Sequence, residues 1–300
     1  MVLYWLCMAH VSDSSIIGVD GGGTTCRFAL VHGGRRYDVQ RRAANATTDP
    51  VGALAALQEG LSALAQAANI PMTELETFPA FLGLAGVVDD TIARDLAQAL
   101  PLQTVRIEDD RRSAMVGALG TSDGCVIGIG TGSFFGRRVD ARDRIIGGWG
   151  FILGDAASGA DLGRHLLRCV LEVHDGLRDA TALTDHMLAK FGSVAGVVAF
   201  ATSAKPGDFA GFAPQIVAAA QEGDKVACHL MNQGAQNVSD ALRDLGWQQG
   251  ERICALGGLA PHYAPYLPAD IAAHLAEPAG TALDGTLILA AQLTPMGETA

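Results

Sequence analysis

Two glycine-rich segments are the part of this sequence that most strongly predicts chemistry. The first reads Asp-Gly-Gly-Gly-Thr-Thr over residues 20–25, and the second reads Gly-Thr-Gly-Ser over residues 130–133. Glycines let a backbone approach phosphate closely, and successive N–H groups form a nest that holds an anion. A tight hairpin does not need three glycines followed by two threonines, so the first segment favours phosphate. The second segment taken alone fits a plain turn equally well.

Two common nucleotide-binding motifs do not fit the first segment. A dinucleotide fingerprint needs a helix after its glycines, whereas residues 24–31 have β-branched ends and no helical period. A P-loop needs a lysine, and the lysines of this chain, at positions 190, 205 and 225, lie in neither glycine segment. The segment is therefore predicted to join two strands, Ile16–Asp20 and 24–31. Asp20 at the strand end is a candidate magnesium ligand, directly or through water.

The two glycine segments lie in similar surroundings. Residues 16–19 read Ile-Ile-Gly-Val and residues 126–129 read Val-Ile-Gly-Ile, about 110 positions later. Each run leads into a turn with glycine and threonine and then into a second strand, the later one over 134–139. This pattern indicates a duplicated unit, although two apolar strands can also match by chance. Two such hairpins facing each other across a cleft would hold a polyphosphate from both sides.

The remaining elements follow from periodicity and from turn residues. Helices are predicted over residues 50–69, 91–100 and 111–119, with strands over 80–84 and 104–107. The second half is predicted to be mainly helical, over 160–174, 182–191, 209–220 and 224–245, before a strand at 253–256 and a helix at 280–293. A boundary is expected near residues 119–123. The expected domains are 1–119, disordered before residue 16, and 120–300, which carries the extra helices.

Composition limits the possible partners. The chain has 300 residues, of which 49% are hydrophobic, and a net charge of −11. It can bury a large core, and its acidity argues against nucleic acid and membranes as partners without excluding ATP. No two cysteines are spaced as CxxC and most lie in apolar runs, which predicts buried free thiols and a reducing, cytoplasmic location. The cysteines are Cys7, Cys26, Cys125, Cys169, Cys228 and Cys254.

Five motifs in order resemble those of a known superfamily, the actin, sugar-kinase and heat-shock-chaperone ATPases. Within it the chain, from Ile16 to about Leu293, is similar to the BadF/BadG/BcrA/BcrD-type ATPases, and most to their N-acetylglucosamine and glucosamine kinases. The resemblance implies an α/β fold of two similar actin-like, ribonuclease H-like domains with an ATP cleft between them. The motifs are residues 20–25; Asp110 with Ala114, Gly117 and Ala118; residues 130–133; residues 147–155 with 158–159 and 162–163; and residues 256–260.

The resemblance implies a reaction. The γ-phosphoryl group of ATP, with Mg²⁺ as cofactor, would be transferred to an amino sugar, most readily to its 6-hydroxyl, by a homodimer. Asp110 would be the general base, since phosphoryl transfer needs a group that accepts the hydroxyl proton. Asp109 and Glu108 are lower-ranked candidates. Without the resemblance, Asp110 would be interpreted as a helix N-cap.

The resemblance also assigns binding residues. Asn45 and Asp155 are expected to be buried polar groups that become paired only when sugar is bound. Sugar contacts are expected from Asn45, Gly86, Asp110, Gly148 and Asp155. ATP contacts are expected from Gly21, Gly22, Gly23, Thr24, Thr25, Thr131, Gly132, Ser133, Gly257 and Gly258.

The chain departs from the family pattern in three places. Ala156 and Ala157 stand where a glutamate and a glycine are frequent, which removes an acidic partner, adds apolar surface and slightly favours the acetylated sugar. Arg111 and Arg112 stand where small residues are usual. Trp149 could stack on a sugar, but a tryptophan beside glycines is interpreted here as a core residue.

Two other functions stay open at this point. One is an ATPase activator of a radical dehydratase, which holds an iron–sulfur cluster between two subunits. Cys125 and Cys169 lie in an apolar strand and an apolar helix, which suits cluster ligation poorly. The other is a non-catalytic sugar or nucleotide sensor, for which the sequence offers neither a helix-turn-helix segment nor a basic patch.

Overall fold

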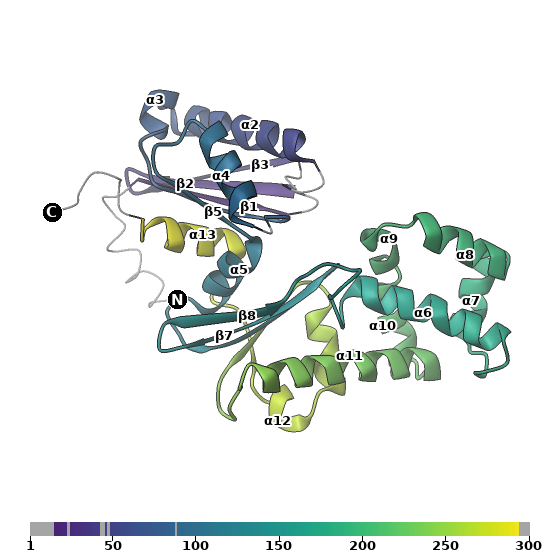
Figure 1. The fold of residues 1–300 in the computed structure, drawn as a ribbon. Helices are drawn as coiled ribbons and strands as arrows, with labels where there is room; N and C mark the ends of the chain where they lie inside the picture. The colour runs from purple at the N-terminus through teal and green to yellow at the C-terminus, as the bar shows by residue number, and fades with distance from the viewer. Residues whose placement is uncertain (1–14, 23–24, 43–45, 47–48, 88, 294–300) are drawn as a thin grey trace. The chain divides into compact units, whose positions relative to one another are not determined.

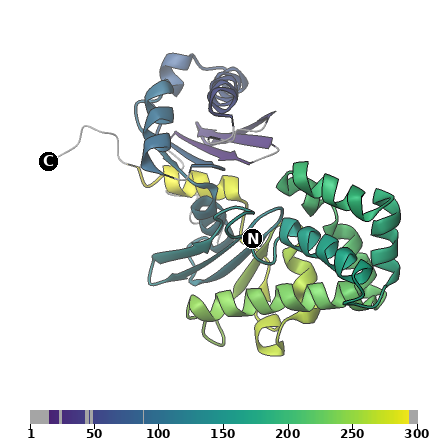
Figure 2. The same ribbon diagram turned by 45° about the vertical axis from the view of Figure 1, so that its right-hand side comes forward.

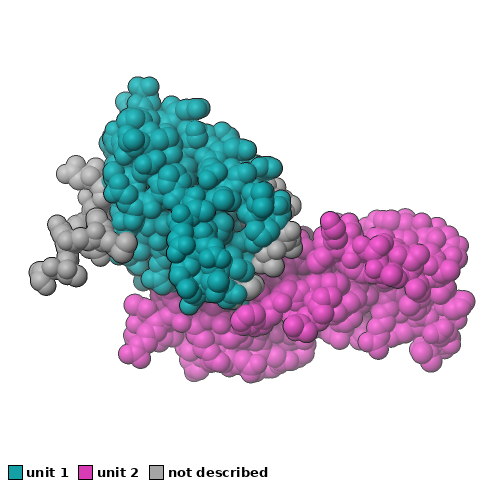
Figure 3. All heavy atoms as spheres, turned by 45° about the horizontal axis from the view of Figure 1, so that its top comes forward, with its two compact units in different colours: residues 1–121, 279–300 teal, residues 122–278 magenta. Residues whose placement is uncertain are grey.

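The chain folds into two compact units, coloured separately in Figure 3. The structure is a computed structural model that describes residues 15–22, 25–42, 46, 49–87 and 89–293. Unit 1 comprises residues 1–121 and 279–300, and unit 2 comprises residues 122–278. Each unit contains a five-stranded mixed sheet with helices packed on it (Figure 1). Within the described ranges, no helix has the length and apolar character needed to cross a membrane.

The sheet of unit 1 has the strand order β3-β2-β1-β4-β5. Strands β1, β2 and β3 pair antiparallel, whereas β4 and β5 run parallel to β1. All five residues of β4, and five of the six in β1, are buried, as their unbroken apolar sequences predict for central strands. The strands are β1 (Ile16–Gly21), β2 (Thr25–His32), β3 (Arg35–Arg42), β4 (Ala80–Leu84) and β5 (Val105–Glu108).

Helices cover both faces of this sheet, as Figures 1 and 2 show. One apolar cluster joins the sheet to α2 (Pro50–Ala68), α3 (Met72–Leu75) and α4 (Asp90–Ala99). Another joins it to α5 (Asp110–Leu119) and α13 (Ala282–Ala290). Local signals fix α2, because Asp49 caps its N-terminus and Pro50 opens its first turn.

The C-terminal helix α13 corrects the predicted domain division. It was assigned to the second domain by chain order, but it packs on unit 1, where Leu283 and Leu287 share an apolar cluster with Phe81. Close packing on α5 requires glycine, because a Cβ at Gly117 would overlap the Thr281 carbonyl oxygen. The division between residues 121 and 122 does fall within the expected boundary at 119–123.

The sheet of unit 2 repeats the topology of unit 1. Its order is β10-β9-β6-β7-β8, with β6, β7 and β8 antiparallel and β9 and β10 parallel to β6. Strand β6 therefore corresponds to β1 and β7 to β2, which confirms the predicted duplication at the level of topology. The strands are β6 (Gly124–Ile129), β7 (Ser133–Val139), β8 (Arg142–Gly147), β9 (Ile253–Leu256) and β10 (Leu275–Ala276).

Unit 2 carries its extra helices between β8 and β9, whereas the described residues of unit 1 form α2 and α3 between the corresponding β3 and β4. The helix predicted over 209–220 is in fact two, since α9 ends at Ala210 and α10 starts anew at Ala213 with Pro214 in its first turn. The helices are α6 (Gly159–His174), α7 (Ala182–Phe191), α8 (Val194–Ser203), α9 (Pro206–Ala210), α10 (Ala213–Gln221) and α11 (Lys225–Asp244), followed after β9 by η1 (Ala260–Tyr266) and α12 (Ala269–Ala272).

The cysteines of the described residues are free thiols, as predicted. Four of them, Cys26, Cys125, Cys169 and Cys254, are buried. Cys228 is only half-buried, and its thiol donates a hydrogen bond to the Ala220 carbonyl oxygen, so the expectation of burial is wrong for this residue. Cys7 lies outside the described residues.

Candidate active site

The parallel strands of unit 1 bring the predicted carboxylates to one sheet edge. Strands β1, β4 and β5 end together, with Asp20 beside Gly83 and Gly83 beside Glu108 in register. Asp110 lies two residues beyond the end of β5 and begins α5. Gly83 lets α5 start close to β4, because a Cβ there would overlap the Ser113 hydroxyl and lie 3.5 Å from the Asp110 Cα. Ligands of open α/β sheets bind at such an edge.

Two of the three consecutive acidic residues at the end of β5 and the start of α5 form ion pairs with arginines. Glu108 accepts hydrogen bonds from Arg106 Nε and from Arg112 Nη1, the latter at 2.9 Å. Asp109 is the N-cap of α5, where it accepts the Arg111 N–H at 2.9 Å and Arg111 Nε at 2.7 Å. Arg111 and Arg112, the departures from the family pattern, therefore neutralise the two lower-ranked base candidates.

Asp110 differs from its neighbours because no arginine among the described residues forms an ion pair with its carboxylate. It is the first residue of α5 and not the N-cap, so the alternative interpretation as a cap belongs to Asp109. Among the described residues, the one hydrogen bond to its carboxylate comes from its own N–H. Burial, followed by the charges of Asp109 and Asp20, raises the pKa of Asp110 to about 6. A carboxylate that titrates near working pH suits a general base.

Asp20 lies at the end of β1 with its side chain 13% exposed. Burial raises the pKa of Asp20, while the nearby Arg27, whose Nη1 is 3.3 Å from Asp20 Oδ2, acts in the opposite direction. Gly22 donates its N–H to the Thr25 carbonyl oxygen at 3.0 Å and so closes the hairpin. Gly21 ends β1 and Thr25 begins β2, whereas Gly23 and Thr24 lie outside the described residues.

The expected sugar-contacting loop of unit 1 is described in part. Asn45 lies outside the described residues, but the next residue, Ala46, donates its N–H to the Ala85 carbonyl oxygen at 3.1 Å. Ala85 in turn donates to the Gly21 carbonyl oxygen at 2.7 Å. Gly86 has a φ of 86°, which explains the need for glycine. Ala46 and Gly86 are thus held at the edge that carries Asp20.

Unit 2 contains a cavity of about 470 Å³ that two predicted nucleotide motifs share. The Leu259 N–H donates to the Ile129 carbonyl oxygen at 3.1 Å, since β9 and β6 are parallel neighbours that end together. This places residues 257–260 beside the turn of residues 130–133. The lining includes Gly130, Thr131 and Gly258, with Ala213, Pro214 and Val217 from α10.

Hydrogen bonds to its carbonyl oxygens hold the turn of residues 130–133 against α6. Gly130 and Thr131 accept hydrogen bonds from the Gly159 and Ala160 N–H groups at the start of α6, at 2.8 and 3.2 Å. A Cβ added at Gly130 would meet no atom within 4 Å, and the same is true of Gly258. Gly257 is different, since its φ is 83° and a Cβ would overlap the Ile129 carbonyl oxygen. Packing therefore explains Gly257, but it does not explain why residues 130 and 258 are glycines.

Two predicted ligand residues of unit 2 are already bonded within the unit. The Ser133 hydroxyl is buried and donates to the Ala156 carbonyl oxygen at 2.7 Å. Asp155 is half-buried, and although burial raises its pKa, the N–H groups of Ser133 and Gly150 bond its carboxylate and oppose that shift. The expectation that Asp155 is buried and unpaired without sugar is therefore wrong. A Cβ at Gly132 would lie 2.8 Å from Asp155 Oδ2, so glycine lets the turn approach this carboxylate.

The loop between β8 and α6 overturns two further interpretations. Trp149 is 66% exposed, so it is not a core residue. Ala157 is fully buried, and of the two alanines only Ala156 presents apolar surface. Gly148 precedes Trp149 with a φ of 74°, a conformation that favours glycine.

This geometry agrees with a family assignment made on sequence. Residues 17–267 match the model of the BadF/BadG/BcrA/BcrD ATPase family. The chain belongs to this family.

Relatives of this BadF-type ATPase include amino sugar kinases. It is 29% identical over 279 residues to a glucosamine kinase of Vibrio cholerae, covering 91% of this chain and 95% of the relative. It is 27% identical over 270 residues to an N-acetyl-D-glucosamine kinase of Dictyostelium discoideum, covering 81% and 84%. A structure from Chromobacterium violaceum, described as a candidate N-acetylglucosamine kinase, matches with a TM-score of 0.79 at 28% identity, covering 93% of this chain and 99% of the other.

Sequence reasoning missed the helical wall of the cavity in this ATPase. Pro214, Val217, Ala218 and Gln221 line it from one side of α10, and His262 adds a polar group from η1. Their spacing of three or four residues was visible in the sequence. Such a mainly apolar stripe is typical of a core-facing helix, so nothing in the pattern pointed to a ligand.

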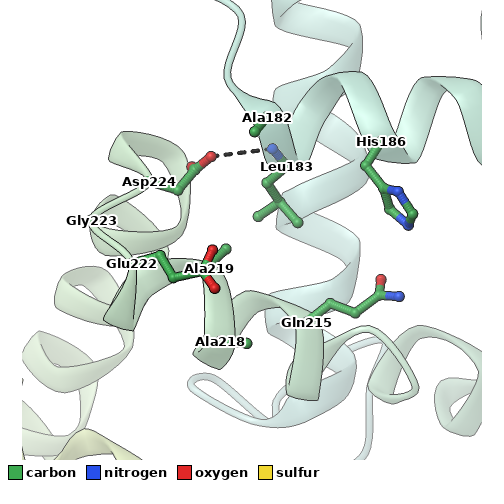
Figure 4. A pocket seen from close by; sticks show the side chains of 9 residues that line it. All are labelled: Ala182, Leu183, His186, Gln215, Ala218, Ala219, Glu222, Gly223 and Asp224. Atoms are coloured by element: carbon green, nitrogen blue, oxygen red, sulfur yellow. Dashed lines mark hydrogen bonds between the residues drawn. The ribbon is translucent and has the colours of Figure 1, made fainter.

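A second cavity, of about 490 Å³, lies where α7 meets the turn between α10 and α11 (Figure 4). None of the residues predicted to bind ligand lines it. The Asp224 carboxylate bonds to both helices at this junction. It accepts the Leu183 N–H of α7 at 3.2 Å, and the Val226 and Ala227 N–H groups of α11 at 2.9 and 3.1 Å. Asp224 is therefore a structural cap that joins two helices.

We expect Asp224→Ala to destabilise the protein by about 1–2 kcal/mol, the usual cost of losing an N-cap. Burial raises the pKa of Asp224, but its hydrogen bonds to N–H groups outweigh burial and lower the pKa overall. Its ionised form therefore stabilises the fold above the unfolded pKa, and this contribution is lost as pH falls through the folded pKa. Urea unfolding at neutral and acid pH measures both effects. Asp224→Asn is the control, since asparagine also caps helices; equal losses in the two variants would contradict the capping role.

Proposed function

We propose that this chain is an ATP-dependent kinase that phosphorylates glucosamine or N-acetylglucosamine at the 6-hydroxyl. The observation that carries the proposal is Asp110, the acidic residue after β5 whose carboxylate no arginine pairs, with its pKa raised to about 6 beside Asp20. The activities of the named amino sugar kinase relatives support the substrate class. The family membership supports the use of ATP.

The nucleotide is assigned to the two glycine turns and the unit 2 cavity. The residues fit a polyphosphate, because Gly130 and Gly258 leave open the space that a side chain would fill, and a Cβ at Gly22 would contact the Thr25 carbonyl oxygen at 3.4 Å without overlap. We leave Ser133 out of the contacts, since its hydroxyl and N–H are used within the unit. The proposed contacts are Gly21, Gly22, Gly23, Thr24, Thr25, Thr131, Gly132, Gly257 and Gly258.

Asp20 is the proposed holder of Mg²⁺, directly or through water, because carboxylate oxygen is the ligand this ion prefers. The ion would offset the charge of the transferred phosphoryl group. Asp110 would accept the proton of the sugar hydroxyl as the new O–P bond forms and the bond from the γ-phosphorus to the β,γ-bridging oxygen breaks, with ADP as the leaving group. Sugar contacts are proposed for Asn45, Gly86, Gly148 and Asp155, whose carboxylate is already oriented by two N–H groups.

A coupled ADP-release assay on a panel of sugars tests this function. We expect kcat/KM for one of the two amino sugars to exceed that for glucose by about tenfold or more, which corresponds to about 1.4 kcal/mol. Ala156 is the exposed alanine that favours the acetylated sugar, and the ratio between the two amino sugars decides that point. Phosphorus NMR of the product identifies the hydroxyl. No turnover with either amino sugar would contradict the substrate class.

The iron–sulfur activator is disfavoured by the state of the candidate cysteines. Cys125 and Cys169 are buried, and burial raises the pKa of both thiols, that of Cys125 to about 12. A cluster shared by two subunits needs exposed thiolates. An ultraviolet–visible spectrum of anaerobically purified protein without cluster absorption is the expected result.

We also propose a cytoplasmic homodimer. The free thiols of the described residues suit a reducing compartment. The dimer is carried over from the family resemblance, and light scattering of the purified protein tests it.

A further inference from the structure

Arg27 occupies a position that the proposed reaction does not yet use. It lies on β2 directly opposite Asp20 on β1. Directly opposite residues in an antiparallel pair project to the same face of a sheet. Arg27 therefore shares with Asp20 the strand ends that lead into the first glycine turn, where Gly22 closes the hairpin on Thr25.

The guanidinium of Arg27 is largely unused. Its Nη1 donates to Asp20 Oδ2 at 3.3 Å, and among the described residues this is its sole hydrogen-bond or ion-pair partner. A guanidinium has five N–H donors, and the side chain of Arg27 is 56% exposed. Arg111 shows the contrast, because it holds Asp109 with Nε at 2.7 Å and Nη2 at 3.1 Å. Arg27 is thus a cation at this edge whose other N–H donors bond to no described residue.

The charges around Arg27 suggest what those donors bind. The edge carries the carboxylates of Asp20 and Asp110, which would repel a nucleotide triphosphate. Neither glycine turn contains a lysine to offset that repulsion. A guanidinium can bind phosphate oxygens with two parallel N–H donors, and Arg27 is the more exposed partner of its ion pair with Asp20, at 56% against 13%.

We propose that Arg27 binds the terminal phosphate of ATP, and that its ion pair with Asp20 keeps the guanidinium at this edge until the nucleotide arrives. The proposal rests on the proposed kinase function. It makes Arg27 a determinant of preference for a triphosphate over a diphosphate, which none of the assigned glycine contacts explains.

The test is a pair of binding measurements that need no sugar. Calorimetry at constant Mg²⁺ compares ADP with the β,γ-imido analogue of ATP. In Arg27→Gln we expect affinity for the analogue to fall about 10- to 100-fold, the usual value of a hydrogen-bonded charge, and affinity for ADP to fall less than about threefold. Arg27→Lys keeps the positive charge but lacks the paired N–H donors of the guanidinium, so its affinity for the analogue should fall less than that of Arg27→Gln.

Arg35→Gln is the matched control, because Arg35 begins β3 opposite His32, at the other end of β2 from the first glycine turn, and its removal changes the net charge equally. It should leave both affinities within about threefold of wild type. Equal losses for ADP and the analogue, or the same loss in Arg35→Gln, would overturn the proposal. Failure of the kinase function would show separately, as absence of sugar turnover in a protein that still distinguishes the two nucleotides.

Discussion

Asp110→Asn is expected to lower kcat by roughly 10²–10⁴-fold, the usual contribution of a general base, with little change in the affinity for ATP. Asparagine keeps the size of the side chain but cannot accept the proton of the sugar hydroxyl. The geometry singles out this residue, because Glu108 and Asp109 are each held by arginines while Asp110 is not. Steady-state kinetics with the preferred amino sugar measure the effect.

Asp109→Asn is the matched control. Asparagine also caps helices, so α5 should still start at residue 110 and kcat should stay within a few-fold of wild type. A larger loss of kcat in Asp109→Asn than in Asp110→Asn would move the base by one residue. A loss shared equally by both variants would indicate that the start of α5, and not a particular carboxylate, matters for activity.

The raised pKa of Asp110 predicts a pH profile. The base must be ionised, so kcat/KM of the wild type should fall about tenfold per pH unit below about 6 and level off above it. The stability effect has the opposite sense. Because the folded pKa lies above the unfolded value, the fold binds more protons than the unfolded chain between about pH 4 and 6, and stability falls as pH rises through that range.

Asp110→Asn removes this ionisation and should therefore be at least as stable as wild type at neutral pH. Urea unfolding at pH 4 and pH 7 checks the sign. A variant that is inactive but more stable than wild type at pH 7 supports a catalytic carboxylate whose burial costs stability. A variant that is less stable at pH 7 would contradict the raised pKa.

The sequence predicted those parts of the fold that short-range chemistry decides. The strands that become β1 and β6 are continuous apolar runs ending in glycine turns, and both their positions and the strand–turn–strand connections are as expected. Asp110 was identified as the base through the resemblance to the family, because its local position after a strand and before a helix predicts a helix N-cap when taken alone. Its contrast with Asp109 was not readable, since it depends on which carboxylate accepts the hydrogen bonds of Arg111.

The parts that were missed depend on contacts distant in the chain. The edge strands β3 and β8 are polar and carry no apolar run, because solvent reaches them. Helix α13 returns to unit 1 from the end of the chain, and chain order cannot reveal that. A tryptophan beside glycines predicts a core residue, whereas Trp149 is 66% exposed.

Gly130→Val is expected to remove ATP binding while leaving the fold intact. A Cβ at residue 130 would meet no protein atom within 4 Å, and Gly130 is outside the left-handed region that favours glycine, so the chain itself tolerates a side chain. The added atoms would project where Gly130 lines the unit 2 cavity and would block a phosphate from the N–H groups of the turn. Affinity for Mg-ATP should fall on the order of 100-fold or more by calorimetry, with an unchanged unfolding midpoint.

Two further glycines of unit 2 separate a ligand effect from a folding effect. Gly207→Val makes the same change on α9, also in open space and outside the cavity lining, and should leave both binding and stability near wild type. Gly257→Ala places a smaller side chain against the Ile129 carbonyl oxygen at a φ of 83°, so it should lower the unfolding midpoint together with binding. If Gly130→Val instead loses stability as Gly257→Ala does, residue 130 is a glycine for reasons of packing. If it keeps both stability and full ATP affinity, the second glycine turn is an ordinary turn and the nucleotide assignment of the cavity fails.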